Sequence, residues 1–224
     1  EIPLRLVGSE MCIRDRLKSL WKCNDQIAQI NYERVQTMNL RMHLTPALLS
    51  YEGIQYQYMA PAVLEDGQWE YVQEHVCILS GFYGVVHPLD GVTPYRLEMQ
   101  TKVNLPNVKN LYEYWGEKIY REVSADTEVI VNLASKEYSK CVEKYLTPEI
   151  RYITCVFAEY KGDKVIEKGT YAKMARGEMV RFLAERKAER PEEMKSFCRL
   201  GYRYSEKEST KDRYVFLKEQ GGDK

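Results

Sequence analysis

The most informative segment of the chain is the run from Ile78 to Lys102, because closely spaced glycines and forced turns lead directly into an unusual cluster of polar residues. An apolar, strand-like run ends at Ser80-Gly81, and a second glycine, Gly84, follows three residues later. Glycines at this spacing allow close backbone approach and leave amide N–H groups free to face an anion. Turn formers come next: Pro88, Asp90, Gly91 and Pro94. They lead directly into a polar cluster: Tyr95, Arg96, Glu98 and Lys102. A core alone does not need such a cluster, so we expect a functional site here.

Length and charge bound the class of protein. With 224 residues the chain fits one domain, or at most two small ones, and is long enough to bury a core. Its formal net charge is zero, so no overall field draws it to DNA or to a membrane, and nucleic-acid binding needs a local basic patch. No run reaches the roughly 18 apolar residues of a membrane helix, and no signal peptide is recognisable. We therefore expect a cytoplasmic protein without a membrane partner.

The six cysteines are scattered without any C-x-x-C pair. This pattern argues against a zinc site and against a disulfide framework. Cys77, Cys141 and Cys155 lie in apolar runs, where we expect them to pack as small hydrophobic residues, with redox sensing by one of them as the alternative. His43, His75 and His87 are too far apart to suggest metal ligands. We therefore expect neither a metal nor a cofactor.

Strand-like and helix-like segments alternate along the chain, which predicts a single α/β domain with a mixed β-sheet surrounded by helices. Asn24-Asp25 is typical of a helix start. Further helices are expected at 69–76, 111–119, 171–185 and 191–198, and a helix capped by Ser135 is expected to bury Tyr138, Cys141 and Val142. Strands are expected at 77–79, 128–133 (buried on both faces), 152–157, 164–169 and 213–217. The domain spans 17–218, and 219–224 is expected to be a disordered tail.

The helix expected over 171–185 carries a basic face. At about 100° per residue, Lys173, Arg176 and Arg181 fall within one arc of roughly 140°, and Ala175, Met179 and Phe182 lie opposite. Gly177 lies inside the basic arc, which suggests that something approaches that face closely. On periodicity alone an ordinary amphipathic helix with a solvated basic side is the simpler interpretation; the functional alternative is phosphate contact by these cations.

A second anion-binding candidate lies where the strand 128–133 passes into the next helix. Free N–H groups at helix starts bind anions, although Ser135 is equally a simple N-cap. Lys136 and Lys140 share one side of that helix and extend the basic surface. Asn132 ends an otherwise apolar strand, and a buried amide needs hydrogen-bond partners, which a site would supply.

Glu98 is the best candidate for general acid–base chemistry, which needs a carboxylate with a perturbed pKa inside a cleft. Strand alternation would place Arg96 and Glu98 on one face, where they form a structural pair or hold a substrate.

These motifs identify a resemblance to the bacterial peroxide-stress protein YaaA family. The run Ser80-Gly-Phe-Tyr-Gly84, then Pro88-Leu-Asp90 and Pro94-Tyr-Arg-Leu-Glu-Met99, is similar to that family's pattern. Further segments match in order: Tyr114-Trp-Gly116, Val131–Tyr138, Tyr171–Gly177 (which includes Lys173-x-x-Arg176-Gly177), Gly201-Tyr202 and Tyr214–Lys218. The resemblance covers about 17–218. The family normally begins with a strand and a Ser-Pro-Ala-Lys-Thr motif, whereas residues 7–16 resemble translated sequencing adapter. We therefore expect 1–16 to be a non-native leader and part of the site to be missing.

The resemblance implies a protein that protects against hydrogen peroxide by limiting free iron. It also implies non-specific binding of double-stranded DNA through a basic cleft and a helix-hairpin-helix-like element, which we place at the turn Leu79–Gly84. Phosphate contacts would come from Lys173, Arg176, Arg181, Gly81, Gly84, Ser135 and Lys136. The alternative is an enzyme acting on a nucleotide or nucleobase in a pocket lined by Tyr83, Tyr95, Arg96, Glu98, Lys102, Asn132 and Tyr138. A third hypothesis is an interaction protein in iron homeostasis without nucleic-acid affinity.

Overall fold

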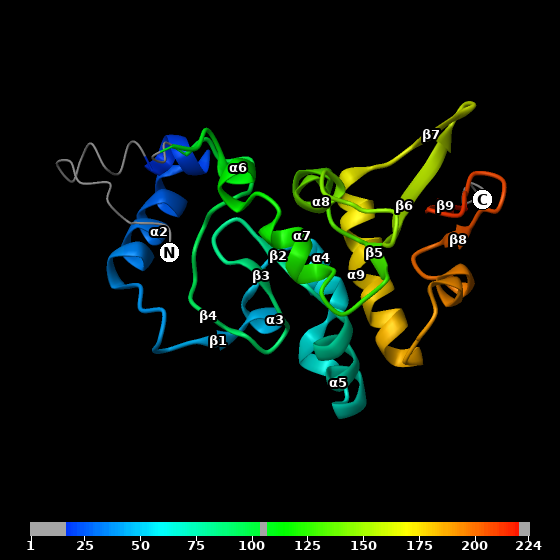
Figure 1. The fold of residues 1–224 in the computed structure, drawn as a ribbon, viewed down its shortest axis with the longest axis horizontal. Coiled ribbons are helices and arrows are strands. Elements are labelled where there is room, and N and C mark those ends of the chain that lie inside the picture. The colour runs from blue at the N-terminus through cyan, green and yellow to red at the C-terminus, as the bar shows by residue number, and fades with distance from the viewer. Residues whose placement is uncertain (1–16, 104–106, 220–224) are drawn as a thin grey trace. The chain divides into compact units, whose positions relative to one another are not determined.

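A computed structural model describes residues 17–103 and 107–219. The chain divides into two compact units (Figure 1). Unit 1 contains the described residues up to Ser50, then Cys77–Glu122 and Lys136–Tyr145; unit 2 contains Tyr51–Val76, Val123–Ser135 and the described residues from Leu146 onward. Each unit takes three separate stretches of the chain, so neither can be cut out at a single linker.

Unit 2 is built on a mixed sheet with the strand order β5-β6-β9-β8. Strands β5 (Val129–Asn132) and β9 (Arg213–Lys218) run parallel to the long central strand β6 (Arg151–Lys161). Strand β8 (Tyr202–Tyr204) pairs antiparallel with β9, and β7 (Lys164–Ile166) forms a hairpin with the end of β6. The expected hairpin is confirmed, but its pairing is made by Glu159–Lys161 with Lys164–Ile166, just beyond the strand expected over 152–157.

The core of unit 2 lies between this sheet and helix α9 (Gly169–Arg186), which runs along it in Figure 1. Buried α9 residues (Ala172, Ala175, Met179 and Phe182) pack with side chains from β6 and β9. Phe157 stacks on Phe216 with ring centroids 5.1 Å apart, and Phe197 from the segment after α9 closes the cluster. The apolar face expected for this helix is therefore the face that packs on the sheet.

A second helix covers the other side of α9. Helix α4 (Ile54–Met59) approaches α9 at Gly177, where a Cβ atom would lie 2.1 Å from the carbonyl oxygen of Gln55. A side chain of any size would therefore push the two helices apart. The remaining helices of unit 2 are α5 (Asp66–His75) and the 3₁₀ segments η1 (Pro61–Val63) and η2 (Pro191–Ser196).

Unit 1 contains two small sheets and several short helices. Strands β2 (Ile78–Ser80) and β3 (Gly84–Val86) pair antiparallel, as do β1 (Thr45–Pro46) and β4 (Gly91–Val92). Its helices include α2 (Asp25–Thr37), α3 (Ala47–Ser50), α6 (Leu111–Trp115), α7 (Lys118–Val123, whose last residue belongs to unit 2) and α8 (Lys136–Glu143). The Asn24 side chain accepts a hydrogen bond from the Ile27 amide, as expected for the N-cap of α2.

The structure confirms the α/β class with a mixed sheet and flanking helices, and it corrects three local expectations. The helix expected over 111–119 is interrupted at Gly116, whose φ of 53° ends α6. Strand β5 is not buried on both faces: it ends the strand order of the described sheet, and Val129 is exposed. Glu219, expected in a disordered tail, donates its N–H to Gly201 O and pairs with Arg203.

Within the described part of the chain, no helix combines the length and the apolar character needed to cross a membrane. The leader expected at 1–16 and the rest of the tail (220–224) lie outside the described residues.

Candidate functional site

The turn of the first motif joins two antiparallel strands, β2 and β3, with Ser80 opposite Gly84. The placement of a helix-hairpin-helix-like element at Leu79–Gly84 is therefore wrong. The Ser80 hydroxyl organises the turn: it accepts hydrogen bonds from the amides of Phe82 (3.1 Å) and Tyr83 (2.8 Å) and bonds to the Tyr95 hydroxyl (2.6 Å). These two amides are thus occupied within the turn.

Both glycines of this turn have a packing role that sequence reasoning missed. Gly84 has a φ of 82°, and a Cβ atom there would lie 2.8 Å from the Trp115 ring. A Cβ atom on Gly81 would lie 2.6 Å from Leu97 O, and Gly81 O accepts a hydrogen bond from Trp115 Nε1 at 3.0 Å. The family-like Tyr114-Trp-Gly segment is therefore the partner of the Gly81–Gly84 turn.

Part of the expected pocket is brought together in unit 1. The rings of Tyr83 and Tyr95 meet edge to face at 5.5 Å. Arg96 pairs with Glu98 at 3.3 Å and donates from Nε to Trp21 O. The pair forms without the expected strand, since 93–98 is irregular. Because the Glu98 side chain is 46% exposed and held by a guanidinium, it acts here as an ion-pair partner. Lys102 is exposed and Tyr138 half-buried in unit 1, whereas Asn132 belongs to unit 2.

Asn132 finds its partners within unit 2. Its Oδ1 accepts a hydrogen bond from the Ala134 amide at 3.0 Å, and its Nδ2 lies 3.5 Å from Thr154 Oγ1. The buried amide at the end of β5 thus shapes the turn toward Ser135 and is satisfied by the fold itself.

The two arginines of the basic arc of α9, Arg176 and Arg181, are engaged in ion pairs. Arg176 is only 12% exposed and pairs with Glu167 at 2.6 Å. Arg181 pairs with Glu185 at 2.9 Å. Lys173 is exposed and takes no part in the ion pairs of the described residues. Gly177, within the basic arc, is buried against α4, so the close approach that the sequence suggested at this position is made by a helix of the protein itself.

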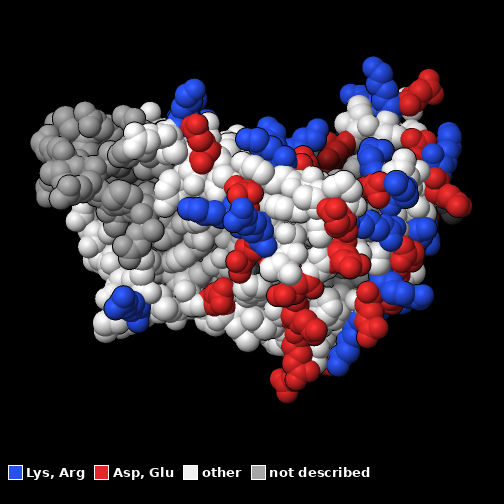
Figure 2. All heavy atoms as spheres, in the orientation of Figure 1, with Lys and Arg blue, Asp and Glu red and all other residues white. Residues whose placement is uncertain are grey.

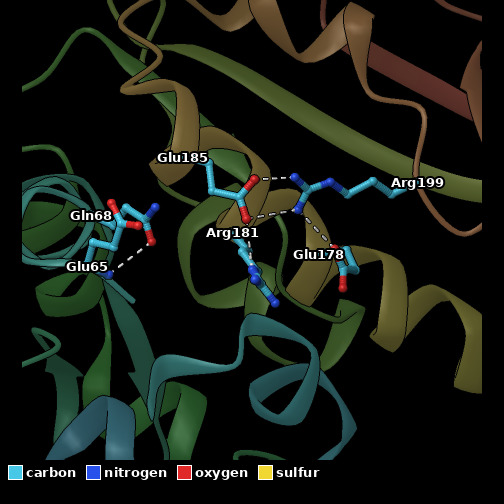
Figure 3. A network of polar contacts seen from close by, with 6 residues as sticks. All are labelled: Glu65, Gln68, Glu178, Arg181, Glu185 and Arg199. Carbon is cyan, nitrogen blue, oxygen red and sulfur yellow. Dashed lines mark hydrogen bonds and ion pairs between the residues drawn. The ribbon is translucent and has the colours of Figure 1, made fainter. Parts of the chain in front are cut away.

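Figure 3 shows how Arg199 extends this network along α9. Its guanidinium binds Glu178 at 3.1 Å and also pairs with Glu185, whose Oε1 accepts hydrogen bonds from both Arg199 and Arg181. Arg199 also lies 5.4 Å from the Phe182 ring. The network attaches the chain after η2 to the exposed side of α9, so these charges act mainly within the protein.

This network predicts acid sensitivity. The hydrogen bond from Arg199 lowers the pKa of Glu185 below its ordinary value of 4.5. A carboxylate whose pKa is lower in the folded state stabilises the fold above its unfolded pKa, and this contribution is lost as the pH falls through the folded pKa. We expect Arg199→Ala to reduce the loss of stability below about pH 4.5, measured by urea unfolding at several pH values. The Glu185→Gln variant should show the same reduced dependence; an unchanged pH profile in both would contradict the assignment.

Helix α8 carries lysines that are not compensated in this way. Lys136, Lys140 and Lys144 recur every four residues, the last directly after the helix, and all three are exposed. We call them the α8 lysine row. None joins the ion pairs found among the described residues. Like charges four residues apart destabilise a helix by about 0.2–0.5 kcal/mol per pair. Sequence reasoning found Lys136 and Lys140 but missed Lys144, although it continues the same spacing.

Beside the α8 lysine row lies an open hollow lined by Tyr112, Lys140, Glu143 and Lys144. The Tyr112 hydroxyl donates a hydrogen bond to Glu137 O at 2.9 Å, and the Glu137 carboxylate accepts one from the Gln100 amide at 3.1 Å. These contacts attach α8 to α6 and fix the Tyr112 ring. Burial, and then the nearby Glu137 carboxylate, raise the pKa of Tyr112, so the phenol is neutral at physiological pH.

The cysteines are free thiols where they are described. Cys141 and Cys155 are buried, as expected, and burial raises their pKa to about 11 and about 12. Thiolates are the reactive species, so these two thiols are inert at neutral pH. Cys77 is exposed, and its expected packing as a small hydrophobic residue is wrong.

The charges on the visible face are mixed. In Figure 2, lysine and arginine side chains of the described residues lie among aspartate and glutamate side chains. Isolated groups of uncompensated lysines, such as the α8 lysine row, therefore provide local positive charge on a protein of zero net charge.

Comparison with known proteins identifies the family. The chain matches the family described as "Peroxide stress protein YaaA" over residues 10–208. It is 61% identical to a UPF0246 protein of Lachnoclostridium phytofermentans, covering 91% of this chain and 80% of the relative. It is 59% identical to a UPF0246 protein of Agathobacter rectalis and 54% identical to one of Desulfitobacterium hafniense, covering 91% of this chain in both and 82% and 81% of those relatives. The chain therefore belongs to the peroxide stress protein YaaA family.

Proposed function

We propose that this protein binds DNA without reading its sequence and acts in the cytoplasm during peroxide stress to limit oxidative damage. Membership of the YaaA family supports the stress role. The proposal includes the lower free iron that the family resemblance implies, as an effect in the cell, and it assigns no iron ligands to the chain.

The observation that carries DNA binding is the α8 lysine row. The row has two exposed lysines on one side of α8 and a third directly after the helix. Without carboxylate partners among the described residues, these lysines repel one another unless an anion neutralises them. A phosphate backbone provides regularly spaced negative charges, and contacts to phosphates carry no sequence information. The ion-paired arginines of α9 are less suited to this role, because binding phosphate would first require breaking their pairs with Glu167 and Glu185.

The test is fluorescence anisotropy with two labelled duplexes of unrelated sequence, in a salt series from about 50 to about 200 mM. We expect equal affinity for both sequences and a linear fall of log K with log salt, with a slope near −0.9 for each phosphate contact. Binding that depends on sequence, or that ignores salt, would contradict the proposal.

A further inference from the structure

The hollow beside the α8 lysine row combines groups that a lysine surface alone does not provide. An aromatic ring (Tyr112), two cations (Lys140 and Lys144) and a carboxylate (Glu143) line one open depression within unit 1. The lysines lie one helical turn apart, and the carboxylate of Glu143 takes no part in the ion pairs of the described chain. Lys140 and Glu143 are three residues apart, a spacing at which opposite charges on a helix commonly pair, so the lack of an ion pair between these two described residues distinguishes this hollow from an ordinary solvated helix surface.

We propose that this hollow holds one unstacked nucleotide of single-stranded DNA. The base would stack on the Tyr112 ring, and the adjoining phosphates would contact Lys140 and Lys144. Stacking on an aromatic side chain is the usual way in which proteins hold single strands, and it requires a base that is free of its neighbours. The inference rests on the proposed DNA binding and refines it, because a duplex can use the lysines but cannot offer an unstacked base to the ring.

The Tyr112 ring is held in a fixed orientation before any ligand binds. The bond from its hydroxyl to Glu137 O fixes its orientation, so little side-chain freedom remains to be lost on binding. The phenol is also neutral, because burial raises its pKa, so it brings no negative charge beside the phosphate.

Glu143 gives the hollow a base preference. Its carboxylate can accept a hydrogen bond from the exocyclic amino group of cytosine, a pairing that carboxylates use in DNA recognition. Thymine has a carbonyl oxygen at the same ring position and would repel it. Oligo(dC) and oligo(dT) have the same ring size and backbone charge, so they form a matched pair of probes.

The experiment measures anisotropy for labelled oligo(dC), oligo(dT) and a duplex with the wild-type chain and with Tyr112→Leu and Tyr112→Phe. Tyr112→Leu should lower affinity for oligo(dC) about fivefold or more, as loss of one stacked base predicts, and should leave duplex affinity unchanged. Tyr112→Phe keeps the ring but loses the bond to Glu137 O that fixes it, so it should lower oligo(dC) affinity by less than Tyr112→Leu does. Tyr171→Leu, at an exposed tyrosine of unit 2, is the control for loss of a surface ring.

In the same series Glu143→Gln should reduce the preference for oligo(dC) over oligo(dT). Equal losses for single strand and duplex in Tyr112→Leu, or no loss for either, would overturn the nucleotide site. If free dCMP displaced oligo(dC) at a concentration comparable to that of the oligonucleotide, the ligand of the hollow would be a free nucleotide and the single-strand proposal would be overturned. Failure of the wild-type chain to bind the duplex would instead reject the proposed function, so the two failures are distinguishable.

Discussion

Replacing Gly177 with alanine should destabilise the protein by roughly 1–3 kcal/mol, although alanine is the better helix former. The added Cβ atom would lie 2.1 Å from the Gln55 carbonyl oxygen, 2.9 Å from the Tyr58 side chain and 3.0 Å from the Met59 amide. Two of these three neighbours are backbone atoms, so a rotamer change does not relieve the clash, and α4 must move away from α9. The gain of about 1 kcal/mol in helix propensity offsets only part of this cost.

The matched control is Gly169→Ala. Gly169 is the first residue of the same helix, and a Cβ atom there meets nothing within 4 Å. Urea unfolding should show a lower midpoint for Gly177→Ala and an unchanged or slightly higher one for Gly169→Ala. If Gly177→Ala were as stable as the wild type, the close contact between α4 and α9 would be wrong.

The second large effect concerns the α8 lysine row. Replacing Lys136, Lys140 and Lys144 together with alanine should weaken duplex binding about tenfold or more at ~0.1 M salt, because three phosphate contacts and their released counterions are lost. The fold should tolerate the change, since all three side chains are exposed and their mutual repulsion is removed.

A matched control removes the same charge elsewhere. Lys161, Lys164 and Lys207 are exposed residues of unit 2, and their joint replacement by alanine changes the net charge equally. Anisotropy at one salt concentration compares the two triple variants. Equal weakening by both would mean that net charge, and not the α8 lysine row, determines binding.

Periodicity predicted the parts of the fold that depend on local pattern. The apolar face of α9, with Ala175, Met179 and Phe182, was correct because burial against a sheet imposes a regular spacing. The hairpin of β6 and β7 was correct because its turn has a clear sequence signal around Gly162, whose φ is 60°.

Features that depend on distant partners could not be found in this way. The basic arc of α9 could be predicted from the sequence. Glu167, which pairs with Arg176, and Arg199, which binds Glu178 on the same helix, come from other segments and could not be predicted. Gly177 suggested the close approach of another molecule, because nothing in its local sequence shows that α4, more than a hundred residues earlier in the chain, packs against it. Tyr112 was missed because an aromatic residue in a helix ordinarily belongs to the core, and only the structure shows it beside Lys140 and Lys144.

The most direct test of the central claim compares two surfaces by their salt dependence. The slope of log K against log salt is measured for a duplex with the wild-type chain, with the α8 triple variant and with Lys173→Ala/Arg176→Ala/Arg181→Ala, after circular dichroism confirms that each is folded. We predict that the magnitude of the slope falls by about 3 for the α8 variant and by no more than about 1 for the α9 variant. The smaller fall is expected because, of the three α9 residues replaced, Arg176 and Arg181 already pair with carboxylates and Lys173 alone takes no part in the ion pairs of the described residues. An unchanged slope for the α8 variant, with a fall of about 3 for the α9 variant, would contradict the account and assign DNA binding to α9.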